Sequence, residues 1–218
     1  MKTTLALAFS LVALALPATA ATAATTVATG TNAPGTVDPN WTINGGAAWT
    51  PTNINTAWFA GGAAQGTNGS NDGARWITPN SNGNANQPAA TVAYATVFTL
   101  SNLGSVANLT GTFWSDNRVL SILLNNVQIY ANGSGASQFA SPGTTLNQLV
   151  NINNGQNTLV FQVQNDTGTS GNPAGLRFTG VFSAVPEPGT WMLMMLGLGA
   201  VGFSMRRRQK TQVRFQFA

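Results

Sequence analysis

Short segments in which apolar and polar residues alternate, each followed by a turn rich in Gly or Asn, dominate the middle of this chain. Residues 91–100 are the clearest case, because every second side chain from Val92 to Leu100 is apolar or a threonine. No segment between residues 38 and 184 shows the 3.6-residue period of an amphipathic helix. We therefore expect an all-β fold, an antiparallel β-sandwich closed as a jelly roll that protects the sheet edges.

The same alternation predicts further strands along the chain. They cover residues 109–114, 119–124, 127–130, 146–152 and 158–164, and a last strand carries Leu176, Phe178 and Phe182 on its inward face. Asn125 and Asn126 predict a tight hairpin, since Asn tolerates the positive φ of a type I′ turn. Residues 146–152 are expected to pair with 158–164 across the turn at 153–156.

This order of strands and turns resembles the galactose-binding-like jelly rolls of secreted bacterial proteins. The resemblance covers residues 40–183 and rests on four segments. These are Trp114 to Asn117, Leu124 to Asn126, Gly155 to Asn165 and residues 175–180. It implies a jelly-roll fold and makes carbohydrate a candidate class of ligand.

The C-terminal quarter contains three elements in a fixed order. Pro186, Glu187 and Pro188 form an extended stretch that cannot join a sheet or helix, because the prolines fix φ and lack backbone donors. The uncharged run from Thr190 to Met205 is 16 residues long, slightly short of a bilayer. Arg206, Arg207 and Arg208 follow and would hold the C-terminus in the cytoplasm. We expect a hydrophobic transmembrane helix whose orientation these arginines set.

Residues 185–208 resemble the PEP-CTERM sorting signal, a motif that is also labelled as the C-terminal domain of ice-binding proteins. The resemblance implies that exosortase, a membrane-embedded cysteine transpeptidase, recognises Pro186, Glu187 and Pro188. The resemblance further implies that exosortase removes the helix and that the protein is released or transferred to the cell surface. The alternative is an ordinary membrane anchor. The family usually ends after its basic cluster, whereas this chain continues through residues 209–218 as a basic cytoplasmic tail.

The N-terminus predicts export. Lys2 precedes an apolar run from Leu5 to Leu16, and small residues offer cleavage after Ala20 or Ala23. We therefore expect a signal peptide over residues 1–23, a flexible leader over 24–37 and the sandwich over 38–184. The expected route is export, an inner-membrane intermediate and then the cell surface or the extracellular space.

The exported domain has little charge and few catalytic side chains. Residues 24–184 contain three arginines and four aspartates, a net charge of −1, so a nucleic-acid partner is not expected. The chain has no His and no Cys, which excludes Ser-His and Cys-His catalysis and the usual zinc sites. Each aspartate lies in a turn and is expected to cap backbone donors. We expect no cofactor and no catalytic residue, with a structural calcium ion at residues 71–73 or 116–117 as the alternative.

Trp114, Asp116, Asn117 and Arg118 are the predicted ligand-binding residues. They lie close together at a strand end, and a sugar site combines an aromatic platform with side chains that bond hydroxyl groups. Trp41, Trp49 or Trp76 could join them. The competing interpretation is that each Trp fills the core and that Arg118 pairs with Asp116 at the surface.

Together these features predict a secreted bacterial surface or matrix protein. Its expected role is that of a non-enzymatic binding or structural module. Its expected partners are an exosortase-type transpeptidase, the membrane through the C-terminal helix, and an exopolysaccharide. Two alternatives stay open, a glycan-active enzyme that works through aspartates alone and a purely structural coat protein.

Overall fold

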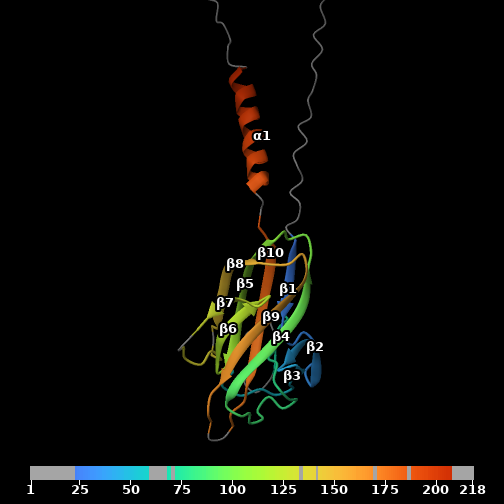
Figure 1. Cartoon of the computed structure of the whole chain (residues 1–218), viewed down its shortest axis with the longest axis vertical. Coiled ribbons are helices and arrows are strands. Elements are labelled where there is room, and N and C mark those ends of the chain that lie inside the picture. The colour runs from blue at the N-terminus through green and yellow to red at the C-terminus, as the bar shows by residue number, and fades with distance from the viewer. Residues whose placement is uncertain are drawn as a thin grey trace, which may run out of the picture.

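The computed structural model describes residues 23–58, 68–69, 72–132, 135–140, 142–168, 171–185 and 188–207. In this part of the chain, ten strands form two antiparallel sheets that pack face to face, and one helix, α1 (Pro188–Arg207), follows the last strand (Figure 1). The predicted all-β sandwich is therefore confirmed.

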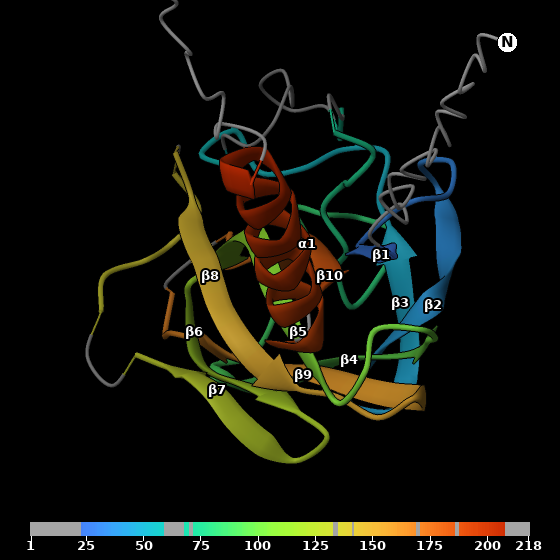
Figure 2. The ribbon, with the colours of Figure 1, turned by 90° about the horizontal axis from the view of Figure 1, so that it is seen from above.

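The two sheets differ in width. The four-stranded sheet has the order β1 (Ala24–Ala28), β10 (Gly175–Ala184), β5 (Val106–Asp116) and β8 (Thr144–Asn151). The six-stranded sheet has the order β3 (Gly46–Thr50), β2 (Thr36–Ile43), β4 (Ala90–Leu100), β9 (Gly155–Asn165), β6 (Arg118–Leu124) and β7 (Val127–Ala131). From β4 onward the chain passes repeatedly from one sheet to the other, which is the winding of a jelly roll. Figure 2 looks along the long axis, with β2 and β3 on one side of the sandwich and β7 and β8 on the other.

The core lies between the sheets and is built from every second residue of the long strands. In β9, Leu159, Phe161 and Val163 are all fully buried, as the alternation predicts. The Phe161 ring lies 5.0 Å from that of Phe178 on β10, so aromatic contacts join the two sheets. The β6–β7 hairpin also forms as predicted, with positive φ at both turn asparagines.

Two expectations about the strands were wrong. The leader predicted over residues 24–37 contains β1, which pairs with β10 along its whole length and buries Val27. Strands β8 and β9 do not pair with each other, because both edges of β9 are taken by β4 and β6 while β8 adds to β5. The turn that was expected to close a hairpin instead carries the chain across the core, where Ile152 is buried.

The strand register defines two ends of the sandwich. Ala90, Asp116, Asn165 and Gly175 lie at one end, here called the loop end. Ala184, the last residue of β10, lies at the opposite end, the tail end, from which the chain continues toward α1 (Figure 1). The side chains at the loop end therefore lie on the side of the sandwich opposite the C-terminal segment.

Several predictions fall on residues outside the described ranges. These are the signal peptide except for residue 23, Pro186 and Glu187 of the sorting motif, Arg208, and the tail over residues 209–218. The backbone of Pro188 begins α1, so the expectation that Pro188 cannot join a helix was wrong, because the first residue of a helix needs no backbone donor. Arg206 lies in the last turn of α1 with an exposed side chain.

Candidate functional site

The predicted ligand-binding residues lie at the loop end, where β5 of one sheet passes directly into β6 of the other. Asn117 is the single residue between the two strands, and its backbone N–H donates to the carbonyl of Gln164 on β9. The structure divides the four residues into two groups. Trp114 and Asp116 belong to a buried cluster, whereas Asn117 and Arg118 contact the segment that follows β9.

Trp114 lies beneath other groups. Only 6% of its surface is exposed, and the guanidinium carbon of Arg177 is 4.5 Å from its ring centroid. A Cβ built on Gly143 would be 2.4 Å from the indole, so the backbone there rests directly on the ring. In this arrangement no sugar face can reach the indole unless Gly143 or Arg177 moves.

Arg177 is buried among these aromatic rings on β10. Its side chain has no exposed surface, and Nη2 lies 2.5 Å from Oδ1 of Asp72. Burial lowers the pKa of Arg177, and the attraction of Asp72 opposes this shift. The ion pair therefore ties the loop that carries Asp72 to the four-stranded sheet.

Asp116 faces the same cluster. Its Oδ2 accepts a hydrogen bond of 2.7 Å from the indole N–H of Trp58, and the residue is 6% exposed. Burial raises the pKa of Asp116 from 3.8 to about 6, with a further rise from Asp166, while the bond from Trp58 opposes the change. The Trp58 ring stacks on Trp76 at 4.3 Å, so the carboxylate sits at the edge of a double aromatic layer.

Asn117 and Arg118 hold the chain after β9. The Asn117 side-chain oxygen accepts from the backbone N–H of Asp166, and Arg118 Nη1 lies 2.5 Å from Oδ2 of Asp166. The pairing of Arg118 with Asp116 in the competing interpretation is therefore wrong, since the partner of Arg118 is Asp166, 48 residues further along the chain. Ligand binding by the four residues remains a prediction, and the structure assigns each of them an intramolecular contact.

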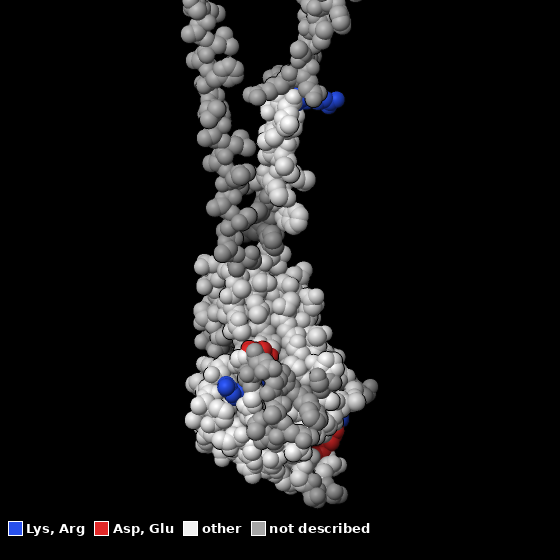
Figure 3. Space-filling model, turned by 180° about the vertical axis from the view of Figure 1, so that it is seen from behind, with Lys and Arg blue, Asp and Glu red and all other residues white. Residues whose placement is uncertain are grey.

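The four aspartates of the sandwich each have a partner. Asp38 accepts from the backbone N–H groups of Gly30 and Asn40, and Asp72 accepts from that of Ala74, so the capping prediction holds for these two. The side chains of Asp116 and Asp166 instead bond Trp58 and Arg118. Among the described residues no three His, Cys, Asp or Glu side chains converge as metal ligands. The face shown in Figure 3 carries only small charged patches.

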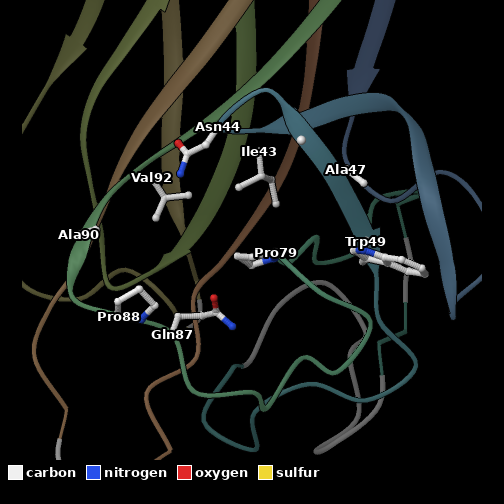
Figure 4. A pocket seen from close by; sticks show the side chains of 10 residues that line it. Ile43, Asn44, Ala47, Trp49, Pro79, Gln87, Pro88, Ala90 and Val92 are labelled. Atoms are coloured by element: carbon white, nitrogen blue, oxygen red, sulfur yellow. The ribbon is translucent and has the colours of Figure 1, made fainter.

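A separate hollow of about 320 Å³ opens at the loop end, between the β2–β3 turn, the start of β4 and two loops. We call it the Trp49 hollow. Its lining includes Ile43, Asn44, Trp49, Pro79, Gln87 and Val92. Figure 4 shows the side chains of Ile43, Val92 and Pro79 converging at its centre, with Asn44 and Gln87 on opposite sides. Trp49 is half-buried, whereas Trp41, Trp58, Trp76 and Trp114 are buried.

Sequence reasoning named Trp49 only as an accessory. Its partners come from segments up to 43 positions away, and no local pattern connects them. Pro79 and Pro88, which line the hollow, were the available signal, since proline rings in loops leave apolar surface outside the core.

The C-terminal segment is unlike the rest of the molecule. The apolar side chains of α1 are exposed, among them Trp191, Leu193, Leu198 and Phe203. Within the described ranges, no helix combines the length and the apolar character needed to cross a membrane. The predicted transmembrane segment over residues 190–205 thus gains no support.

The chain thus combines a jelly-roll sandwich with a C-terminal helix whose described side chains are exposed. Residues 184–208 match the family model of the PEP-CTERM protein-sorting motif. The motif implies processing by exosortase and indicates a protein sorted to the cell surface or the extracellular space. Among curated proteins, none matches this chain in sequence.

Two solved structures are similar to this chain at low sequence identity. One is a family 35 carbohydrate binding module from Clostridium thermocellum, with 12% identity and a TM-score of 0.37 over 73% of this chain and 99% of that one. The other is a GH26-CBM35 β-(1,4)-mannanase from Podospora anserina, with 13% identity and a TM-score of 0.35 over 76% of this chain. The similar part spans 28% of the mannanase.

Proposed function

We propose that this protein is an exported bacterial surface or matrix protein, that exosortase removes its C-terminal segment, and that its sandwich is a non-enzymatic module that binds carbohydrate. The hydrophobic segment serves as the signal and is absent from the mature protein.

The position of the sorting motif carries the part of this proposal that concerns removal of the C-terminal segment. Strand β10 ends at Ala184, and the matched motif begins at the same residue. The last fully buried side chain of the strand is Phe182, whereas the described side chains of α1 are exposed. Cleavage within the motif would therefore remove no core residue, and the sandwich keeps every sheet hydrogen bond.

The contacts of the aspartates argue against a glycosidase site. A glycosidase needs two carboxyl groups that flank a bond in an open site. Here Asp116 is buried against Trp58, and Asp72 and Asp166 are held in ion pairs with arginines. Asp38 is bonded to two backbone N–H groups. Each carboxylate is thus committed to the structure of the sandwich.

A glycan array probed with the full chain, followed by product analysis on every glycan that binds, tests this function. We expect retention of particular glycans without release of shorter products. Release of reducing ends would show the enzymatic alternative, and an array without any bound glycan would favour a structural coat protein.

A further inference from the structure

The Trp49 hollow combines the two kinds of surface that a sugar ring requires. Trp49 is the one tryptophan of the described sandwich that is not buried, and its ring forms one wall. Ile43 and Val92 form the apolar floor, where they are 6% and 7% exposed. A pyranose has apolar C–H faces that pack on such surfaces and hydroxyl groups around its edge that need polar partners.

Two amide side chains supply those partners. Asn44 Oδ1 accepts the backbone N–H of Ala93 at 2.8 Å, which fixes the side chain. Its NH₂ group donates no hydrogen bond to the described residues and remains for a ligand. Across the hollow, Gln87 makes a long side-chain bond of 3.4 Å to Ala85, and its Oε1 accepts none from the described part of the chain. One donor and one acceptor therefore face the same space (Figure 4).

The walls of the hollow are fixed before any ligand arrives. Trp49 and Thr78 exchange backbone hydrogen bonds of 2.9 and 2.8 Å, which hold Pro79 opposite the floor. The Gln87 backbone N–H donates to the Asn172 carbonyl, and the buried Asn165 side chain bonds the Pro88 carbonyl. A preformed site loses less conformational entropy on binding than a flexible one.

The lining contains no charged residue. An ionised uronic acid or a sulfated sugar would lose hydration here without gaining a cation, which is costly in a partly buried site. Its volume, about 320 Å³, lies at the lower end of ligand pockets, roughly 300–1,000 Å³. It suits one ring of a longer chain that leaves through the open side.

We propose that the Trp49 hollow binds one uncharged sugar residue of a polysaccharide, with Trp49 as the stacking platform and the amides of Asn44 and Gln87 as partners of its hydroxyl groups. This inference rests on the proposed carbohydrate-binding function and locates it. Because the hollow lies at the loop end, the glycan would be held on the side opposite the cleaved C-terminal segment.

Affinity gel electrophoresis of the full chain tests the site with soluble neutral glucan, mannan, xylan and galactan, and with alginate and polygalacturonate as charged probes. We expect at least one neutral polymer to retard the parent chain and the two polyuronates to leave its mobility unchanged. Trp49→Ala should weaken the retardation about ten-fold or more, since stacking and burial are both lost. Trp191→Ala removes the same side chain from α1 and should change nothing.

A second pair of variants tests the Trp49 hollow if Trp49→Ala fails to fold. Asn44→Asp retains the oxygen that accepts from Ala93 but replaces the NH₂ donor with a negative charge, so binding should again fall about ten-fold. The matched control, Asn126→Asp, lies in the exposed β6–β7 turn and should bind like the parent chain.

The outcomes distinguish a failure of the proposed site from a failure of the proposed carbohydrate-binding function. If the parent chain binds a neutral polymer and both Trp49→Ala and Asn44→Asp bind it equally well, the hollow is not the site, although the proposed function stands. Binding only of the polyuronates also overturns the hollow. A parent chain that binds none of the probes overturns both the site and the carbohydrate-binding function.

Discussion

Replacing Asp116 with Asn tests the electrostatics of the buried aromatic cluster. The carboxylate is 6% exposed and accepts one hydrogen bond from Trp58, and burial raises its pKa to about 6. Asn keeps an oxygen that can accept from the indole but cannot ionise. The substitution therefore removes the titration while conserving the shape of the side chain.

The size and sign of the effect follow from the pKa values. In the unfolded chain the pKa of Asp116 returns to its ordinary value of 3.8, so the folded protein binds more protons between pH 4 and 6. Stability is then gained as the pH falls through 6 and is lost as the pH rises from 4 to 6. The shift corresponds to about 2 kcal/mol of unfolding free energy between pH 4.5 and 7.5.

Urea unfolding followed by tryptophan fluorescence at pH 4.5, 5.5, 6.5 and 7.5 measures this contribution. The difference in unfolding free energy between the parent chain and Asp116→Asn should change by about 2 kcal/mol across the series. The stability of the parent chain relative to the variant should rise as the pH falls. Trp58→Phe removes the bond that lowers the pKa, so its transition should move to higher pH. A difference that stays constant with pH would show that the pKa of Asp116 is not raised in the folded protein.

Two further predictions concern packing and processing. Gly143 has a φ of +88° and lies against Trp114, whereas Gly104 has a φ of +78° and open space where a Cβ would be. In thermal or urea unfolding, Gly104→Ala should lower the unfolding free energy by about 1 kcal/mol and Gly143→Ala by about 2–4 kcal/mol. Equal losses would contradict the contact between Gly143 and Trp114. In the native host, Glu187→Ala should leave the C-terminal segment attached, which immunoblotting against a C-terminal tag detects. The control variant Gln209→Ala should be processed normally. Normal processing of Glu187→Ala would show that exosortase does not recognise the motif.

The inward faces of the strands could be predicted from the sequence, whereas of the two predicted strand pairings only the β6–β7 hairpin formed. Alternation fixes which side chains of β9 point inward, because successive residues point to opposite faces of a sheet. It contains no information about which strand lies alongside, so β8 was assigned to β9 instead of β5. The Ala and Thr residues of β1 were too weakly apolar to indicate a strand, yet pairing with β10 orders them at the sheet edge.

The candidate site was harder to predict than the fold. Trp114 to Arg118 are neighbours in sequence, but the chain changes sheets at Asn117, which separates their side chains. The ion pairs of Arg118 and Arg177 reach 48 and 105 residues along the chain, too far for any spacing argument. The sorting motif is the opposite case, because it is read as a linear segment and its order is visible in the sequence.

The intact mass of the mature protein, purified from its native host, tests whether exosortase removes the C-terminal segment. We predict a chain that begins after the signal peptide and ends at or before Pro188, so that the sandwich is complete and α1 is gone. A mature chain that still carries Arg206, Arg207 and Arg208 would contradict sorting by exosortase and would show that the C-terminal segment is a lasting part of the protein.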